Sequence, residues 1–426
     1  MRRVVITGMG VVSCLGNEVE TVWRAVAAGQ SGLAPMTRWD PAGLRNPRMG
    51  EVKDFPWDGE HDEAAQFALH AAGQALRAAG LRPSDAGGVP EGLPGGDSPC
   101  AERGFLPTGT KGGDSPPEGM QIGLVSSTNF GGAASWDQYL ASLREGYVDA
   151  EIAELFREFT FNRTAELLVK RYNLGGPVRV LSLSCSSGAA AIGQGLDLIR
   201  LGKAPAVLCE GHDSLAYSSM AGLSILRTIT NEEIRPFDAR RSGTLFGEGS
   251  AALVLEELEH ARARGAAILA EVLGYAVNNN AYHLTAPDKE GEGIVAVLRE
   301  ALRDAGVMGE EIDYVNAHGT GTAYFDVTET KAVKTVLGDR AYQIPMSSIK
   351  PAVGHMMAAA GSVEALITIC ALRDGIAPPT LNLEQPDPEC DLNYVPGTAQ
   401  QVDMRTALSI SSGIGGNNAA VVIRKW

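Results

Sequence analysis

The sequence of 426 residues lacks the features that would place it in several common protein classes. No apolar run reaches the roughly 18 residues of a membrane-spanning helix, so we expect a cytoplasmic protein with no membrane partner. Its six cysteines form no CxxC pair and no Cys/His spacing of a metal site, which indicates a reducing compartment and predicts no bound metal. Lys and Arg number 36 against 51 Asp and Glu, and the net charge of −15 argues against nucleic acid as a partner.

What the sequence does have is a regular alternation of short Val/Ile/Leu/Ala strands with Ala-rich helical patterns. Such alternation is typical of an α/β fold with a buried sheet. The helices that we expect span 62–79, 164–171, 189–201, 293–305 and 328–337. The strands that we expect span 3–6, 122–126, 178–183, 206–210, 251–255, 314–317 and 419–423. Cys209 and Cys370 lie within apolar runs and are assigned to the core.

The first residues have the charge order of a short signal peptide, with Arg2 and Arg3 before an apolar stretch. Thr-Gly-Met-Gly at 7–10 interrupts that stretch, and 17–20 has the pattern of a capping box that opens a helix. We therefore expect a first strand, a loop and a helix.

Residues 83–119 differ in composition from the rest of the chain. They are rich in Gly, Pro, Ser and Asp, and Gly-Gly-Asp-Ser-Pro occurs at 95–99 and again at 112–116. Few apolar groups are present to offset the entropy of ordering such a segment, so we interpret it as a flexible surface insertion. A partner-binding loop is the alternative.

Cys185 is the first candidate for a reactive group. It ends an apolar, β-rich run at 178–184 and is followed by Ser-Ser-Gly and a helical pattern. The unpaired N–H groups and the positive dipole at a helix start favour a thiolate, so we expect the pKa of Cys185 to lie below the usual value of roughly 8.5. An inert, buried cysteine is the alternative.

The segment 344–372 repeats this arrangement, with a strand, a turn, His355 and a helix of small residues. The two patterns predict duplicated halves, each presenting one reactive side chain to a shared cleft. We place the halves at 1–256, with Cys185, and at 266–426, with His318 and His355, because 257–265 is polar and charged.

Two more segments carry chemistry at strand ends. His318 lies in Asn-Ala-His-Gly-Thr-Gly-Thr at 316–322, and like His355 it follows a strand at a Gly-rich turn, where α/β proteins place active-site loops. Either histidine alone is more commonly structural. The Gly-rich segment 413–418 precedes the last strand, and its backbone N–H groups could stabilise an oxyanion.

In this order and with these flanks, the motifs resemble the β-ketoacyl-[acyl-carrier-protein] synthases, in the synthase I/II (elongating) branch of the thiolase superfamily. The likeness covers almost the whole chain and includes Val-Val-Ile-Thr-Gly-Met-Gly at 4–10, Arg-Pro-Phe-Asp at 235–238, Phe-Gly-Glu-Gly at 246–249 and Ser-Ile-Lys at 348–350. The resemblance implies a thiolase-like five-layer αβαβα fold of two pseudo-repeated halves, usually a homodimer.

The same resemblance implies a decarboxylative Claisen condensation of an acyl thioester with a malonyl thioester. Cys185 would accept the acyl group, and His318 and His355 would hydrogen-bond the malonyl carbonyl. The backbone N–H groups of Cys185 and Ile414 would hold the oxyanion. A thiolate, two neutral donors and a dry oxyanion pocket are what the chemistry needs.

Supporting roles fall to a second set of residues. Lys350 would tune the charge of the site, and Glu364, Thr320, Thr322 and Gly415 would support it. The resemblance implies no metal or other cofactor. It implies acyl carrier protein, in its acyl and malonyl forms, as the partner.

Two positions depart from the family in ways that bear on substrate. Ile414 stands where a gating phenylalanine is usual, and Phe130 stands at the far end of the acyl pocket, where a small or aliphatic residue is usual. A phenyl ring there predicts a short or unusual acyl primer and a specialised fatty-acid or polyketide pathway.

Other functions stay open. A cysteine-dependent acyltransferase or thioesterase would use Cys185 without forming a carbon–carbon bond. The presence of both His318 and His355 argues against it, because simple hydrolysis needs only one base. The chain could also be the catalytic subunit of a ketosynthase/chain-length-factor heterodimer. Because the carrier protein and this chain are both acidic, docking needs a local basic patch. Arg227, Arg240 and Arg241 are candidates, with ordinary surface or loop-anchoring roles as the alternative.

Overall fold

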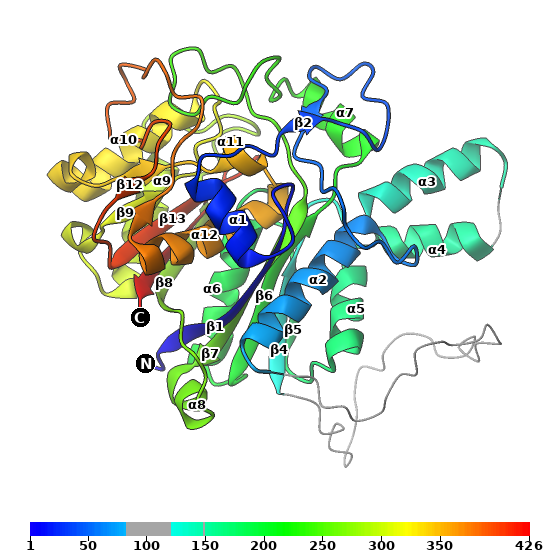
Figure 1. Cartoon of the computed structure of the whole chain (residues 1–426), viewed down its shortest axis with the longest axis horizontal. Coiled ribbons are helices and arrows are strands. Elements are labelled where there is room, and N and C mark those ends of the chain that lie inside the picture. Colours follow the sequence, from blue (N-terminus) through cyan, green and yellow to red (C-terminus); the bar gives the residue numbers. More distant parts are fainter. Residues whose placement is uncertain (82–120, 148–149) are drawn as a thin grey trace.

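The computed structural model describes residues 1–81, 121–147 and 150–426. The predicted insertion at 83–119, with Cys100 inside it, lies outside the described residues. The described chain is built on ten strands that are hydrogen-bonded in one continuous order, with helices packed on both faces (Figure 1).

The strand order divides into two matching halves. The first half, from the middle of the sheet outward, consists of β1 (Val4–Val12), β7 (Gly249–Glu257), β6 (Ala206–Asp213), β4 (Ile122–Ser127) and β5 (Val178–Leu181). The second half runs β8 (Ala270–Asn279), β14 (Asn417–Lys425), β13 (Thr406–Ser412), β9 (Tyr314–Asn316) and β10 (Met346–Ser347). In each half the first two pairings are antiparallel and the next two are parallel. The halves meet where β1 pairs with β8, with Val4 opposite Val272.

Helices complete the layers. Two central helices, α6 (Ser187–Arg200) and α12 (Ala360–Asp374), contact strands of both halves and so form a layer between them. One outer layer holds α2 (Glu63–Ala78) and α5 (Arg163–Tyr172), packed on the first half. The other holds α9 (Glu292–Ala305) and α10 (Phe325–Leu337), packed on the second. This arrangement confirms the predicted α/β, five-layer fold of two similar halves; the boundaries at 256 and 266 stay a prediction.

The remaining elements are short or peripheral. They are α1 (Val19–Ala27), α3 (Ala133–Arg144), α4 (Ala150–Phe159), α7 (Tyr217–Ile225), α8 (Leu258–Ala263), α11 (Lys350–Val353) and the short strands β2 (Ala34–Pro35), β3 (Arg48–Met49), β11 (Ile376–Ala377) and β12 (Gln400–Gln401). Helices α3 and α4 pack on each other at one end of the molecule, and the two chain termini lie close together (Figure 1).

The five predicted helices all form, with ends within three residues of the expected ones. The core placement of Cys209 and Cys370 is also confirmed, since both are fully buried. The N-terminal segment differs from the prediction. Strand β1 continues to Val12 through the glycines expected to interrupt it, with a register shift after Ile6.

The reason lies in packing against α2. A Cβ at Gly8 would lie 2.1 Å from the carbonyl oxygen of Ala75, and one at Gly10 would lie 2.0 Å from that of Ala71. These glycines therefore let the helix approach the strand and do not mark a turn. The predicted capping box is also wrong, because α1 begins at Val19 and its N-cap, Glu18, makes no side-chain capping bond.

Candidate active site

Cys185 lies in a sharp turn between β5 and α6. Ser184, just before it, has a φ of 56°, in the left-handed region that residues other than glycine rarely occupy. The hydroxyls of Ser186 and Ser187 donate to the carbonyl oxygens of Leu183 (2.7 Å) and Ser184 (2.6 Å) and hold the turn. The thiol is thereby fixed directly before the start of α6.

The thiol of Cys185 does not have the lowered pKa that its position predicts. Burial raises the pKa of the Cys185 thiol, and this outweighs the Ser184 hydroxyl, the Lys350 ammonium and the Ile414 backbone N–H, which each lower it. The sequence-based prediction is wrong because removing a thiolate from water is unfavourable, and a helix start does not compensate for it. Cys185 is therefore a protonated thiol at neutral pH.

His318 follows β9 in a loop whose backbone is held by a carboxylate. Glu329, on α10, accepts the N–H of His318 (2.6 Å) at one oxygen and the N–H of Gly319 (2.9 Å) at the other. Glu329 is buried, so both bonds are shielded from water. This clamp sets the direction in which the imidazole leaves the loop.

His355 is fixed on both sides. Its N–H donates to the carbonyl oxygen of Leu245 (2.8 Å), and its own carbonyl accepts from Gly247 (3.1 Å). The Nδ1 atom of its ring accepts the backbone N–H of Met357 (3.2 Å). A neutral imidazole carries one proton, so an acceptor at Nδ1 places that proton on Nε2. Nε2 of His355 is therefore a hydrogen-bond donor.

The rings of His318 and His355 lie side by side. Their centroids are 5.6 Å apart and their planes are nearly perpendicular, at 85°. Burial, reinforced by the nearby Lys350 ammonium, lowers the pKa of each imidazole well below its usual value. Both rings are consequently neutral at pH 7 and can donate hydrogen bonds without carrying a charge.

Lys350 is a buried lysine close to the two imidazoles. Its ammonium group donates to the carbonyl oxygen of His318 and to the carboxylate of Glu364, and both charged side chains are almost completely buried. The second carboxylate oxygen of Glu364 accepts from the hydroxyl of Ser411 (3.3 Å). This ion pair fixes the His318 backbone and places a positive charge below the site.

The loop between β13 and β14 closes over the thiol. The backbone N–H of Ile414 is one of the groups near the Cys185 sulfur that lower the pKa of its thiol. A Cβ at Gly413 would lie 2.9 Å from the backbone nitrogen of Cys185, so this position has room only for glycine. Gly415 donates to the carbonyl oxygen of Leu284 (2.7 Å), which holds the loop in place.

These groups meet at one cavity of about 720 Å³. Of the predicted site residues, the cavity is lined by Cys185, His318, His355, Ile414, Phe130, Thr320 and Thr322. The hydroxyls of the two threonines are hydrogen-bonded to each other (3.0 Å). Lys350 and Glu364 do not line the cavity but lie below it, and Gly415 acts through the loop backbone. The spatial convergence predicted for the thiol and the two imidazoles is present.

Comparison with known proteins decides the family. The profile of the β-ketoacyl synthase N-terminal domain matches residues 1–93 and 108–261, and that of the C-terminal domain matches residues 269–384. The chain belongs to the β-ketoacyl synthase family.

Individual relatives match over the full length. A 3-oxoacyl-[acyl-carrier-protein] synthase 2 of Coxiella burnetii is 36% identical, with 100% of this chain and 99% of the relative covered. Among solved structures, the ishigamide ketosynthase/chain length factor has a TM-score of 0.86 and 34% identity, covering 100% of this chain and 99% of that one. A type II polyketide acyl carrier protein in complex with its hexaketide-bound ketosynthase has a TM-score of 0.87 and 31% identity over the whole of both chains.

Sequence reasoning missed several residues that shape this β-ketoacyl synthase site. Glu329 carries no local signal, because its partners are backbone N–H groups of the His318 loop. Phe246 packs on the His355 ring with its plane at 22° and centroids 5.6 Å apart. Phe325 lies edge-on to His318 at 6.0 Å. Phe246 belongs to the Phe-Gly-Glu-Gly motif, which signals a turn but not the ring contact.

The three arginines expected to dock the partner have different environments. Arg240 is paired with Asp238 (3.0 Å) and Glu384 (2.8 Å). Arg241 is buried against Asp387 (2.6 Å) and bonds the carbonyl oxygen of Thr322 (3.1 Å), so it anchors the loop after His318. Arg227 is exposed, lines the mouth of the cavity and has no carboxylate partner among the residues that the structure describes.

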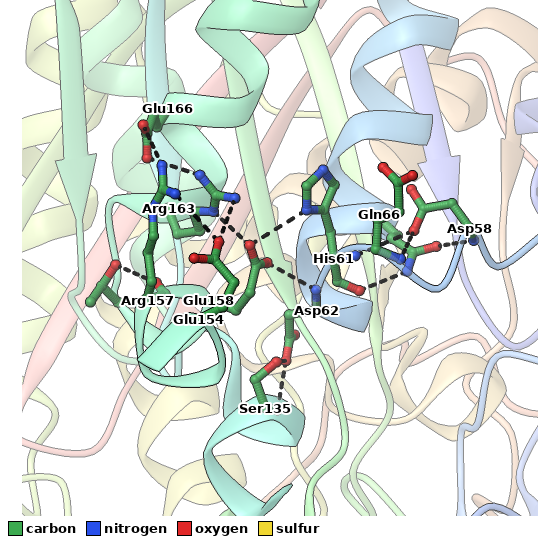
Figure 2. A network of polar contacts seen from close by, with 12 residues as sticks. Asp58, His61, Asp62, Gln66, Ser135, Glu154, Arg157, Glu158, Arg163 and Glu166 are labelled. Carbon is green, nitrogen blue, oxygen red and sulfur yellow. Dashed lines mark hydrogen bonds and ion pairs between the residues drawn. The ribbon is translucent and has the colours of Figure 1, made fainter. Parts of the chain in front are cut away.

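A second hollow, of about 790 Å³, lies between α2 and α5 on the outer face of the first half. Arg157, Arg163 and Glu166, which line it, belong to a network of ion pairs (Figure 2). Arg163 pairs with Glu158 (2.6 Å) and Glu166 (3.2 Å), and Glu158 also accepts the N–H of Asp62 (3.0 Å) and faces His61 (3.4 Å). The network ties α2 to α4 and α5, which is a structural role.

Within residues 1–81, 121–147 and 150–426, no cluster of three or more His, Cys, Asp or Glu side chains is arranged to hold a metal ion. No helix in the same ranges has the length and apolar character needed to cross a membrane.

Proposed function

We propose that this chain is a condensing enzyme that joins an acyl thioester to a malonyl thioester on acyl carrier protein and releases carbon dioxide and a β-ketoacyl thioester. The observation that carries this function is the meeting of one thiol, Cys185, with two neutral imidazoles, His318 and His355, at a single cavity.

In the first step the sulfur of Cys185 attacks the carbonyl carbon of the incoming acyl thioester. The thiol proton leaves with the thiol of the carrier's pantetheine arm, so the acyl group is transferred without net charge. The backbone N–H groups of Cys185 and Ile414 hold the oxyanion of the tetrahedral intermediate. The influence of the Ile414 N–H on the pKa of the Cys185 thiol supports this role, and both residues line the same cavity.

In the second step a malonyl thioester binds with its carbonyl oxygen at the two imidazoles. Its carboxylate leaves as carbon dioxide, and the electron pair of the broken carbon–carbon bond forms an enolate. The proton on Nε2 of His355 supports its role as one donor to the enolate oxygen, and we assign the other to His318. Neutral donors stabilise the charge without becoming permanent ion-pair partners.

In the third step the enolate carbon attacks the acyl thioester on Cys185. The carbon–carbon bond forms, the sulfur leaves as a thiolate that takes one proton from solvent, and the β-ketoacyl product stays on the carrier. Lys350 binds the carbonyl oxygen of His318, and its positive charge adds to burial in keeping both imidazoles neutral, while Glu364 holds the lysine in place.

Phe130 is half-buried and lines the cavity, and from this bulky ring we infer a short or unusual acyl primer and a specialised fatty-acid or polyketide pathway. We propose that the enzyme works in the cytoplasm as the catalytic member of a dimer. A homodimer is favoured, and a heterodimer with a chain-length-factor subunit is the alternative, for which the ishigamide structure is a precedent.

Acyl carrier protein is the proposed partner, and its docking surface is at the mouth of the cavity. Arg227 is the one candidate arginine there without a carboxylate partner in the described ranges, and Ile225 beside it is 80% exposed. An acidic carrier could therefore meet one unpaired positive charge and an apolar side chain.

The test is a product assay with acyl and malonyl carrier protein, followed by mass spectrometry of the intact enzyme. The wild type should carry the acyl group on Cys185 and form a β-ketoacyl product, and Cys185→Ala should do neither. Release of free acid without a new carbon–carbon bond would instead support the thioesterase alternative.

A further inference from the structure

Asp213 is a buried carboxylate that the proposed chemistry does not use. It ends β6 and is fully buried. One of its oxygens, Oδ1, accepts the hydroxyl of Thr128 (2.8 Å) and the backbone N–H groups of Asn129 (3.0 Å) and Phe130 (3.1 Å). These bonds fix the turn that carries the Phe130 ring into the wall of the catalytic cavity.

The second oxygen reaches the other side of the site. Oδ2 accepts the backbone N–H of Ala358 (2.8 Å), which lies in the turn after His355. Its neighbour Met357 has a φ of 54°, in the left-handed region, and this conformation aims the Met357 N–H at Nδ1 of His355. Such a conformation needs support from outside the turn, and the Asp213 carboxylate supplies it.

The first of these turns also reaches the nucleophile. The side-chain amide of Asn129 can be oriented so that both its oxygen and its nitrogen have hydrogen-bond partners. In this orientation the nitrogen donates to the carbonyl oxygen of Ser184 (3.0 Å) and to the hydroxyl of Ser187 (3.2 Å). Ser184 is the strained residue directly before Cys185. Asp213 therefore lies between the acyl-pocket wall, the Cys185 turn and the His355 turn.

We propose that Asp213 is a positioning residue that sets the Phe130 wall of the acyl pocket and the imidazole of His355 together. This role rests on the proposed condensation and deepens it. Because the two oxygens of one rigid group bind the two turns, weakening the carboxylate should disturb acyl selection and decarboxylation at the same time. A residue with a purely structural role would alter stability alone.

The decisive variant is Asp213→Asn. The amide has the same shape as the carboxylate but has only one acceptor oxygen. Its NH2 group would face one of the two turns and could not accept the backbone N–H groups there. We expect the turnover of malonyl thioester decarboxylation to fall about tenfold to a hundredfold, the effect of a misplacement of about 1 Å. The KM for the malonyl thioester should change much less. The preference among acyl primers, measured by loading on Cys185, should change in the same variant.

Asp313→Asn is the matched control. Asp313 also accepts two backbone N–H groups, those of Arg405 (2.8 Å) and Thr406 (3.1 Å), but neither of these two residues lines the catalytic cavity. Both variants should unfold at similar temperatures, and Asp313→Asn should keep the wild-type rates and primer preference. Equal effects of the two variants on rates and preference would overturn the role of Asp213.

A spectroscopic measurement distinguishes the effect of Asp213 on the His355 turn from its effect on the Phe130 turn. In protein labelled with ¹⁵N in histidine, His355 should show the tautomer with its proton on Nε2, and Asp213→Asn should lose or mix that signal. Thr128→Val removes a bond only on the Phe130 side, so it should change primer preference and leave the His355 signal as in the wild type. An unchanged His355 signal in Asp213→Asn would contradict the proposal that Asp213 positions the His355 imidazole.

The activity of the wild-type enzyme distinguishes a failure of the proposed function from a failure of the role of Asp213. If wild-type enzyme neither loads an acyl group nor decarboxylates malonyl thioester, the proposed function fails. If it does both, and Asp213→Asn matches the wild type in rate and primer preference, only the role of Asp213 fails.

Discussion

Lys350 and Glu364 form a buried ion pair next to the imidazoles of His318 and His355, with side-chain exposures of 1% and 2%. A buried pair of this kind contributes little net stability, but breaking it leaves one charge uncompensated in a dry environment. The pair also has a local task, because the Lys350 ammonium holds the carbonyl oxygen of His318 and lowers the pKa of both imidazoles.

Lys350→Met should therefore lower the free energy of unfolding by about 3–5 kcal/mol, because the Glu364 carboxylate is left buried and unpaired. The double variant Lys350→Met/Glu364→Leu should recover most of that loss and remain inactive. Urea unfolding of both variants, together with a malonyl decarboxylation assay, checks the two expectations.

Lys334→Met is the control for removing a lysine from an ion pair. Lys334 pairs with Asp391 (2.8 Å) at the surface, where such pairs contribute less than about 1 kcal/mol. If Lys350→Met and Lys334→Met lowered the free energy of unfolding equally, burial of the unpaired Glu364 carboxylate would not be the cause of the loss.

The pH dependence of alkylation reports the state of Cys185. Burial raises the pKa of its thiol above the usual value, so the thiolate is scarce at pH 7. The rate of modification by iodoacetamide should then rise about tenfold for each pH unit between 7 and 8.5, without a plateau. Lys350→Met should slow the reaction further, because the lysine charge lowers the pKa of the thiol.

Mass spectrometry of the intact protein over this pH range measures the rate, with Cys185→Ala showing the background of the other cysteines. A plateau below pH 8 would mean that the helix start outweighs burial after all.

How much of this site could be predicted depended on how far apart the interacting residues are in the sequence. The Cys185 turn was predictable, because an apolar strand, a cysteine and a small-residue helix follow one another directly. The helices were predictable for the same reason, since their patterns are local. The raised pKa of the Cys185 thiol was not, because burial is a property of the folded chain.

The same reasoning explains the residues that were missed. Asp213 and Ala358 are 145 positions apart, and the carboxylate binds a backbone N–H that any residue could supply. Glu329 likewise binds the backbone of His318 and Gly319. The sequence predicts a loop at Gly8 and Gly10, because the approach of α2 to the strand cannot be seen in the sequence.

Phe130 offers a test of substrate size. Its half-buried ring lines the cavity, so Phe130→Ala should enlarge the pocket and shift acyl loading on Cys185 toward longer chains. Phe130→Leu removes less volume and should have an intermediate effect. Competition among acyl carrier substrates of increasing length, read as the mass added to Cys185, measures the shift. A preference for long chains in the wild type, unchanged in both variants, would show that the ring does not limit the pocket.

The last prediction concerns the carrier. Arg227 is exposed at the cavity mouth without a carboxylate partner in the described ranges, whereas Arg240 is paired with Asp238 and Glu384. Arg227→Ala should raise the KM for acyl carrier protein about two- to fivefold, as expected for one exposed charge pair, and the difference should shrink at high salt. Ile225→Ser should raise the same KM without a salt dependence, since it removes only apolar contact.

Neither change should alter acylation of Cys185 by a small pantetheine thioester, because that substrate reaches the cavity without the protein part of the carrier. Arg240→Ala is the comparison within the same set of arginines, and it should leave the KM for the carrier near the wild-type value. If Arg240→Ala raised that KM and Arg227→Ala did not, the carrier would dock away from the mouth, over the loop that Asp238 and Arg240 hold together.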